Sequence, residues 1–323
     1  MNTLYPLRFV PLLKRYLWGG RRLKTVLGKP IGDENCAESW EVVDHRDDQS
    51  RVAFGPLAGT TLGELVRQRW QELLGLRQPP EPRFPLLLKF LDANQSLSVQ
   101  VHPNDQQAAR LNPPDRGKNE AWVVLAAEPQ SVIYAGLKRG VDRPTLEREL
   151  ARGTVELCLN RIVPAVGDCI FIPAGTVHAL GAGLLVAEVQ QSSDTTFRLF
   201  DWNRVGPDGK PRTLHVEQAL EVIRFDRPPP VPQPPRATDR PTVERLITCD
   251  SFMLDRWHLD APQPLGDDGR MHIVTVLEGS VDLEGDPAPR PLAKGDTALV
   301  PAAFGARQLS PAANATLLDI YLP

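Results

Sequence analysis

With 323 residues, the chain is long enough for two domains and a sizeable core, and its 24% charged and 41% apolar residues are ordinary for a globular protein. A formal charge of −3 gives no general attraction to nucleic acid or to an anionic membrane, so we expect neither as a partner. The chain lacks a run of about 18 apolar residues, a secretory pattern at its N-terminus and a C-x-x-C pair among its four cysteines, which together favour a reduced, cytoplasmic protein.

Short apolar runs dominate the first two thirds of the chain and are typical of strands. Helical periodicity interrupts them at residues 61–76, 144–159 and 216–225, and Thr60 or Thr61 is available as N-cap of the first helix. Because the strands do not alternate regularly with helices, we expect an antiparallel sandwich or barrel. The predicted strands span residues 85–91, 97–102, 121–127, 131–137, 169–173, 184–189 and 195–202.

The run Gly167-Asp-Cys-Ile-Phe-Ile-Pro173-Ala-Gly175-Thr-Val-His178 combines a short strand with a tight turn that ends at an imidazole. Pro173 stops the strand because it cannot donate to a ladder, and Gly175 permits the turn. Imidazole is the commonest metal-ligating side chain. The run is similar to the second cupin motif, in which this histidine binds a metal. The alternative is a hairpin in which His178 has only a structural role.

Side chains that can bind a metal also occur elsewhere in the chain. Gln100 and His102 stand at i and i+2 of one apolar strand, so their side chains face the same way and need a partner, either a metal or a hydrogen-bond network. Glu120 opens the next strand, where it is either a ligand or exposed at a rim. Together with His178 these residues offer two nitrogens and two oxygens without a thiolate. Such a set suits Zn²⁺ and can also hold Mn²⁺ or Fe²⁺.

Three further residues are candidates for ligand binding. Lys89 lies within an apolar strand, where an unpaired ammonium is costly to bury. It therefore needs an anion, an exposed face or a salt bridge, for which Glu38 is a candidate. Ser98 shares the face of the two strand ligands and can donate a hydroxyl. Trp18 belongs either to the core or to the wall of a ligand site.

A proline-rich segment at residues 227–235 is stiff and extended, which indicates a linker. The segment 295–306 repeats the Gly-x5-Pro spacing described above, but Ala303 and Ala306 replace the second glycine and the histidine. We therefore predict a second, similar β module with a structural role. Its expected strands span residues 243–249, 252–259, 272–277, 280–283, 297–301 and 316–322.

Several segments together resemble type I mannose-6-phosphate isomerases of the short bacterial branch, over about residues 5–225 and more weakly beyond. They are Trp18-Gly19-Gly20, Cys36-Ala-Glu38-Ser-Trp40-Glu, Gln100-Val-His102-Pro, Gly117-Lys118-Asn-Glu120-Ala-Trp122, Pro173-Ala-Gly175-Thr-Val-His178-Ala and Glu188-Val-Gln190-Gln-Ser-Ser-Asp194-Thr-Thr-Phe-Arg198-Leu-Phe-Asp201. The resemblance implies a mainly β fold of two cupin-like jelly-roll modules with an appended helical segment. The expected parts are a catalytic cupin domain with helical insertions at 1–226, a Pro-rich linker at 227–241 and a degenerate cupin-like domain at 242–323.

The same resemblance implies an activity and a role for each candidate residue. The activity is interconversion of mannose 6-phosphate and fructose 6-phosphate by proton transfer through a cis-enediol. One zinc ion would be bound by Gln100, His102, Glu120 and His178. The implied catalytic residues are Arg198, the base Glu188 and its rival Lys118. The implied substrate contacts are Lys89 and Ser98, with Lys118 or Arg198, at the phosphate and Trp18 at the sugar.

Two other functions fit the same residues. A sugar-phosphate-binding cupin without turnover would be stabilised by its ligand but would convert nothing. A metal oxygenase needs redox-active iron with open positions, whereas the neutral amide of Gln100 favours Lewis-acid chemistry. We therefore expect a cytoplasmic isomerase whose partner is a small sugar phosphate.

Overall fold

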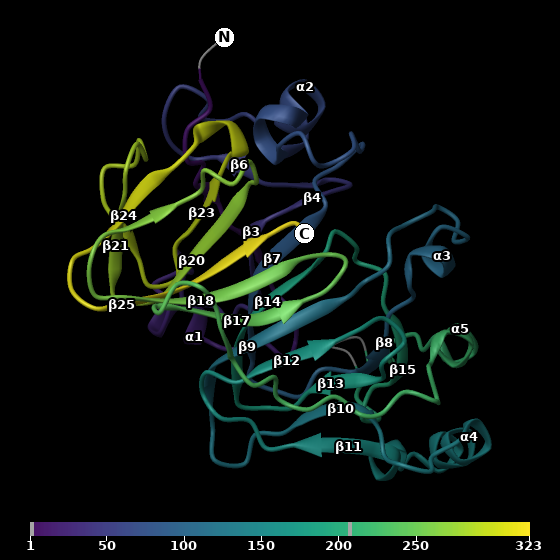
Figure 1. Cartoon of the computed structure of the whole chain (residues 1–323). Coiled ribbons are helices and arrows are strands. Elements are labelled where there is room, and N and C mark those ends of the chain that lie inside the picture. The colour runs from purple at the N-terminus through teal and green to yellow at the C-terminus, as the bar shows by residue number, and fades with distance from the viewer. Residues whose placement is uncertain (1–2, 206–208) are drawn as a thin grey trace.

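Two β modules lie side by side in this computed structural model, which describes residues 3–205 and 209–323 (Figure 1). The N-terminal module, mostly purple to teal, extends through α5 (Val216–Val222), and the strands of the C-terminal module, green to yellow, begin with β16 (Arg236–Ala237). Each module contains two main antiparallel sheets and few helices. This architecture confirms the prediction of a mainly β fold.

The N-terminal module packs a six-stranded sheet against a five-stranded sheet, and the facing sides of the two sheets share a core. In order across the first sheet, the strands are β12 (Cys169–Ile172), β9 (Glu120–Ala127), β14 (Leu184–Gln191), β7 (Leu86–Ala93), β3 (Glu38–Val42) and β2 (Leu12–Lys14). Across the second sheet they are β11 (Leu159–Ile162), β10 (Ile133–Leu137), β13 (His178–Leu180), β8 (Val99–Val101) and β15 (Phe197–Phe200).

Short elements connect and flank these sheets. The longest helix, α2, begins at the capping box in which Thr61 and Glu64 exchange side-chain-to-backbone hydrogen bonds. No helix in the described part of the chain is long and apolar enough to cross a membrane. The small strand pairs are β1 (Phe9–Val10) with β6 (Arg51–Val52) and β4 (Asp44–His45) with β5 (Asp48–Gln49). The helices are α1 (Arg22–Thr25), α2 (Leu62–Leu74), α3 (Asp105–Ala108), α4 (Arg143–Arg152), η1 (Val155–Cys158) and α5 (Val216–Val222).

The C-terminal module repeats this two-sheet arrangement around its own core. Its larger sheet contains, in order, β16 (Arg236–Ala237), β17 (Val243–Thr248), β18 (Met253–Leu259), β25 (Ala315–Tyr321), β20 (His272–Glu278) and β23 (Thr297–Val300). Its smaller sheet contains β19 (Gln263–Leu265), β24 (Arg307–Pro311), β21 (Ser280–Leu283) and β22 (Leu292–Ala293). The short helix η2 (Ala302–Phe304) contacts α2 of the other module.

An apolar core joins the two modules through the outer faces of their six-stranded sheets. Phe90 of β7 and Leu318 of β25 both belong to it. The beginning of the chain also binds the C-terminal module, because the backbone N–H and carbonyl groups of Leu7 both pair with Leu299 at 2.8 Å. The N-terminal segment is therefore part of the contact between modules.

Strand alternation divides β14 between two environments. Ala187 and Val189 point into the core between the modules, whereas Val186 points into the interior of the N-terminal module. Glu188 has the parity of Val186 and is buried on the interior side, where it lines a pocket. The strand thus carries an ionisable group on one face and an apolar contact surface on the other.

The predicted strands lie close to the observed ones, but the helix predicted at residues 144–159 is wrong in its second half. Helix α4 ends at Arg152 because Gly153 has φ of 72°, the left-handed conformation that commonly ends helices. A 3-10 turn follows, and β11 begins at Leu159.

The proline-rich segment lies along the edge of the N-terminal module. Pro232 pairs with Ile170 of β12, and the N–H of Gln233 donates to the carbonyl of Cys169 at 2.7 Å. The segment therefore covers an edge strand as well as connecting the modules. The domain boundaries given above stay a prediction about which parts fold as units.

Candidate active site

Two histidines and a glutamate converge inside the N-terminal module. His178 opens β13 and pairs with Gln100 of β8, while His102 follows β8 and Glu120 opens β9. One ligand atom from each of His102, Glu120 and His178 lies within 4.8 Å of the others, and all three residues are buried. Strands from both sheets therefore bring together residues that are far apart in the sequence.

Hydrogen bonds to the backbone fix both imidazole rings. The Nδ1 atom of His102 lies 2.9 Å from the carbonyl of Thr195, and Nδ1 of His178 lies 2.9 Å from the carbonyl of Thr176. A carbonyl only accepts, so each Nδ1 carries the hydrogen and each Nε2 presents a lone pair toward the cluster. Burial lowers the pKa of both rings, and that of His102 falls to about 3. Both imidazoles are therefore neutral at neutral pH, which is the form that binds a metal.

Glu120 supplies negative charge between these two lone pairs. Its Oε1 lies 3.1 Å from Nε2 of His178, and its Oε2 lies 3.4 Å from Nε2 of His102. Burial is the largest single influence and would raise the pKa of Glu120, but Lys118, His102 and His178 together outweigh burial and hold that pKa well below its usual range. Among the described residues, Oε1 has no hydrogen-bond donor although it is buried. This donor-poor set of two neutral imidazoles and a carboxylate fits a divalent cation.

Gln100 lies beside the same cluster. Its amide nitrogen is 3.3 Å from Nε2 of His178, and its amide oxygen is 3.5 Å from the hydroxyl of Ser98. Since the oxygen and nitrogen of an amide exchange places by a half-turn, the ligand oxygen of Gln100 can face His178 at the position its nitrogen now occupies. Gln100 is thus placed to complete a set of four ligands.

A chain of alternating charges continues from the cluster across the six-stranded sheet. Lys118 contacts Glu120, its Nζ lies 3.2 Å from Nε2 of His102, and it lies 3.4 Å from Oε1 of Glu188. Lys89 lies 3.5 Å from that same Oε1 and 3.4 Å from Oε2 of Glu38. Both ammonium groups are therefore held between buried carboxylates, as the salt-bridge interpretation of Lys89 predicted.

The carboxyl group of Glu188 has an unusual environment. Burial raises its pKa above the usual range, although Lys89 and Lys118 act in the opposite direction. The indole N–H of Trp122 donates to Oε2 of Glu188 at 3.1 Å, which fixes the direction of the carboxyl group. A fixed carboxyl with a raised pKa has the properties of a general base that can hold and return a proton.

Arg198 approaches the cluster from the five-stranded sheet. It pairs with Gln100 across β15 and β8, and its Nη1 donates to the carbonyl of Thr213 at 2.9 Å. Its Nε is buried and has no acceptor among the described residues. His215 fixes its backbone, because the N–H of Arg198 donates to His215 Nδ1 at 3.2 Å and the N–H of His215 donates to the Arg198 carbonyl at 2.7 Å. The guanidinium group therefore retains an unused donor beside the pocket.

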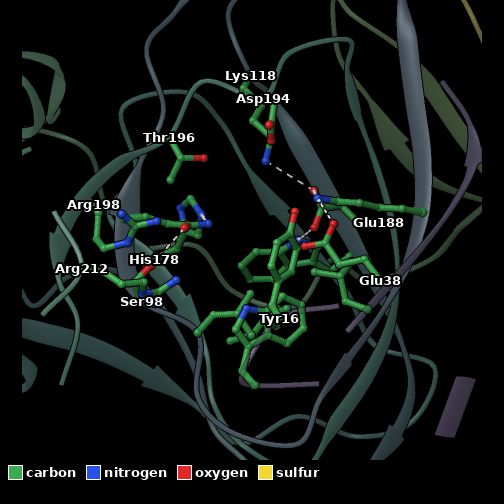
Figure 2. Close-up of a pocket in the computed structure, with 17 residues that line it drawn as sticks. Tyr16, Glu38, Ser98, Lys118, His178, Glu188, Asp194, Thr196, Arg198 and Arg212 are labelled. Atoms are coloured by element: carbon green, nitrogen blue, oxygen red, sulfur yellow. Dashed lines mark hydrogen bonds and ion pairs between the residues drawn. The ribbon is translucent and has the colours of Figure 1, made fainter. Parts of the chain in front are cut away.

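A pocket of about 300 Å³ opens next to this cluster, a volume near the lower end for small-molecule sites (Figure 2). Lys118 lies in the wall of this pocket and contacts both His102 and Glu120. The other predicted site residues line the pocket itself: Trp18, Lys89, Ser98, Gln100, Lys118, His178, Glu188 and Arg198. The structure thus brings together every residue proposed from the sequence.

The lining residues outside the predicted site residues include Tyr16, Asp194, Thr196 and Arg212. Tyr16 stacks on Trp18 with ring centroids 5.7 Å apart, and burial raises the pKa of its hydroxyl to about 12. Tyr16 and Arg212 lie outside regular strands, so periodicity gives no signal for them. Asp194 and Thr196 lie within the segment that carries the family resemblance, which is the signal that could have found them.

Comparisons with known proteins agree with this geometry. Residues 7–123 match a family model described as "Phosphomannose isomerase type I, catalytic domain". The chain is 35% identical over 308 residues to the mannose-6-phosphate isomerase ManA of Bacillus subtilis, which covers 94% of this chain and 95% of that protein. This chain belongs to the type I phosphomannose isomerase family.

Other members of the phosphomannose isomerases resemble it along nearly the whole chain. The mannose-6-phosphate isomerase of Streptococcus mutans is 31% identical and covers 92% of each protein. The crystal structure of the mannose 6-phosphate isomerase from Bacillus subtilis has a TM-score of 0.89 at 30% identity, covering 98% of this chain and 99% of that one. A variant of the phosphomannose isomerase from Salmonella typhimurium, 17% identical, shares the fold with a TM-score of 0.78, covering 99% of this chain and all of that one. Type I phosphomannose isomerases are metal-dependent, and His102, Glu120 and His178 form a possible metal-binding triad.

Proposed function

We propose that this chain interconverts mannose 6-phosphate and fructose 6-phosphate with the help of one bound zinc ion. One observation carries the proposal. Two neutral imidazoles and a carboxylate whose Oε1 has no donor among the described residues meet at the wall of a pocket that also contains a basic carboxyl group, Glu188, and an arginine, Arg198. A sugar phosphate in this pocket would meet every group that an aldose–ketose isomerisation requires.

The proposed ion ligands are Gln100, His102, Glu120 and His178. Nitrogen and oxygen donors without a thiolate favour Zn²⁺, with Mn²⁺ and Fe²⁺ as the other candidates. Such an ion supplies Lewis acidity that favours an oxyanion on the substrate. Because Glu120 is the only anionic ligand proposed, a bound dication would keep about one unit of positive charge.

Glu188 is the proposed base. Its carboxylate takes the C2 proton of mannose 6-phosphate, which the neighbouring C1 carbonyl acidifies, and returns that proton to C1 of the cis-enediol. The hydroxyl proton passes from O2 to O1, so that the carbonyl group ends at C2. The buried environment that raises the pKa of Glu188 strengthens it as a base. Lys118 is the rival, but its Nζ is already engaged by two carboxylates, since it contacts Glu120 and lies 3.4 Å from Oε1 of Glu188.

Arg198 is the proposed group that stabilises the developing oxyanion. Its Nε has no acceptor among the described residues, and it pairs with Gln100 at the edge of the ligand cluster. A donor already fixed in position costs no reorganisation when the charge develops.

The proposed contacts of the substrate's phosphate group are Lys89 and Ser98, as expected from the sequence, and also Arg212. Lys89 is held between Glu38 and Glu188, so a phosphate at this position must compete with two carboxylates. Arg212 lies on the same side of the pocket as Arg198 and Ser98, where it binds Asp201 through Nε at 2.7 Å (Figure 2). A substrate of this kind belongs to the cytoplasm, in agreement with the expected location.

The direct test is turnover by the purified, zinc-loaded chain. We expect NMR spectra to show conversion of mannose 6-phosphate into fructose 6-phosphate, and His178→Ala to lose both the metal and the activity. Stoichiometric zinc with no turnover, but with stabilisation by the sugar phosphate, would instead identify a binding protein. Oxygen consumption that depends on iron would identify an oxygenase.

A further inference from the structure

The C-terminal module contains a pocket of its own. It has a volume of about 190 Å³ and lies among residues of β17, β18, β20 and β25, the larger sheet of that module. This volume is more than ten times the roughly 10–15 Å³ that holds one water and lies below the usual range of small-molecule sites, so the pocket fits only a small ligand. None of its lining residues takes part in the site proposed above.

Strand register places this second pocket at the position of the first. In the N-terminal module Glu120 of β9 pairs with Ile172, the residue before Pro173 of the Gly-x5-Pro run. In the C-terminal module His272 of β20 pairs with Val300, which precedes the proline of the repeated run. His272 therefore occupies the position that Glu120 has in the first module.

The next two strands extend the equivalence. Glu188 pairs with Lys89 across β14 and β7. Asp319, which occupies the position of Glu188, pairs with Asp255 across β25 and β18. The three interior positions that carry the charges of the first site thus carry His272, Asp319 and Asp255 in the second. The prediction of a structural role for this module rested on its missing motif histidine and did not take these residues into account.

Geometry excludes His272 as a metal ligand. Its Nδ1 lies 2.9 Å from Asp319, and its Nε2 lies 3.2 Å from Asp268. Each carboxylate accepts a hydrogen bond, so both ring nitrogens carry hydrogen and the ring is positively charged. Burial lowers the pKa of His272, but Asp319 and Asp268 outweigh burial and raise it to about 10. The pocket therefore has a fixed ion-pair wall in place of a metal site.

A second group of hydrogen bonds fixes the neighbouring part of the wall. Arg245 binds Asp255 and donates from Nη2 to the hydroxyl of Tyr321 at 2.6 Å. The same hydroxyl donates to Oδ2 of Asp255 at 2.9 Å. These side chains are held in place before any ligand arrives, which reduces the entropy lost on binding.

Trp257 gives the pocket an aromatic wall with an unsatisfied donor. The residue is 3% exposed, and its Nε1 is buried without an acceptor among the described residues. The guanidinium of Arg240 lies 5.3 Å from the ring centroid. A buried indole N–H normally finds a partner, so an oxygen from a bound molecule would supply what the module lacks.

The charge balance decides the ligand class. This pocket is lined by four carboxylates, Asp239, Asp255, Asp268 and Asp319, and by three cationic groups, Arg240, Arg245 and His272. The sum is near neutral with one excess negative charge, which disfavours a phosphate dianion. By contrast, the first pocket is lined by two lysines and two arginines against the three carboxylates Glu38, Glu188 and Asp194, which leaves one excess positive charge. Carboxylate acceptors, guanidinium donors and an indole suit a neutral molecule with many hydroxyl groups.

We propose that the C-terminal module carries a second small-molecule site that binds an uncharged polyhydroxyl compound of the size of a free hexose. Interior positions of the C-terminal module form this site, just as the equivalent positions of the N-terminal module form the first site. It requires neither the metal nor turnover, so the proposal is independent of the isomerase function.

Calorimetric titration of the full chain with D-mannose, D-fructose and D-glucose, each at up to about 10 mM, tests the proposal. The His178→Ala variant serves as a parallel sample without turnover. We expect one of the three sugars to bind both proteins equally, and Trp257→Phe to weaken that binding roughly tenfold while leaving kcat unchanged. Arg240→Ala, a change at an exposed residue, provides a second variant that is expected to fold and to bind more weakly.

Other outcomes overturn the proposal. Binding that persists in both variants but disappears in Arg212→Ala would place the sugar in the first pocket. Absence of binding for all three sugars would leave the cluster a structural ion-pair network. Tighter binding of mannose 6-phosphate than of mannose to a Trp257-dependent site would contradict the neutral ligand class.

Discussion

Glu188 of β14 lies directly opposite Lys89 of β7, and Glu188 Oε1 is 3.5 Å from Lys89 Nζ inside the N-terminal module. Burial raises the pKa of the carboxyl group, and Lys89 is the strongest charge that opposes this effect. Lys89, which we propose as a phosphate contact, therefore also influences the proposed base.

Replacement of Lys89 by methionine keeps the volume of the side chain and removes its charge. The pKa of Glu188 should then rise further, so that less of the base is deprotonated at neutral pH. We expect the ascending limb of kcat/KM against pH to move about one unit to higher pH. The control is Lys24→Met at an exposed position. A limb that stays in place would show that Glu188 is not the titrating base.

Arg212→Ala tests the phosphate contact that the sequence did not reveal. Loss of a charge-assisted hydrogen bond should raise KM for mannose 6-phosphate roughly tenfold with little change in kcat. Inhibition by inorganic phosphate should weaken in parallel. Arg224→Ala, at an exposed arginine paired with Asp226, is the matched control. A fall in kcat at constant KM would instead assign Arg212 to the chemical step.

His215 is a positioning residue for Arg198, because the two residues exchange hydrogen bonds through the Arg198 backbone. His215→Ala should lower kcat roughly tenfold while bound metal remains stoichiometric. His215→Asn offers an acceptor of similar position and should restore part of the rate. Equal rates for the two variants would contradict the role, and metal analysis of each separates it from damage to the ligand cluster.

The stability of the C-terminal module should depend on pH through His272. Its pKa is raised to about 10 in the folded protein from an ordinary value of 6.5, mainly by Asp319 and Asp268 against the effect of burial. The folded form therefore holds a proton that the unfolded form has lost between these values. This contribution is complete below pH 6.5 and disappears as the pH rises through about 10.

Chemical denaturation followed across this range checks the expectation. The free energy of unfolding should fall as the pH increases from 6.5 to 10, and His272→Gln should flatten the slope. His258→Gln, at an exposed histidine of the same module, should keep the slope of the parent chain. A parent curve without a slope would contradict the charged state of His272.

Local rules were sufficient for the part of the site that lies on strands. Alternation predicted that Gln100 and His102 point together and that Glu188 faces away from Ala187, because neighbouring residues of a strand face opposite sides. Pro173 and Gly175 defined the turn before His178. The family resemblance then connected these strands, which periodicity alone cannot pair.

Contacts that depend on the packing of distant segments could not be predicted in this way. Tyr16 and Arg212 enter the pocket from loops, whose side-chain directions follow no period. The pairing of Leu7 with Leu299 joins residues at opposite ends of the chain. The length of α4 depended on the backbone conformation of Gly153, a glycine that the helical pattern of residues 144–159 does not distinguish from an interior position.

Strand β14 separates the pocket of the N-terminal module from the core between the two modules. Glu188 faces the pocket, while Ala187 and Val189, its immediate neighbours, pack in the core between the modules. Any loosening of the contact between the modules would therefore reach Glu188 through one peptide unit. The C-terminal module is thus placed to brace the carboxyl group that we propose as the base.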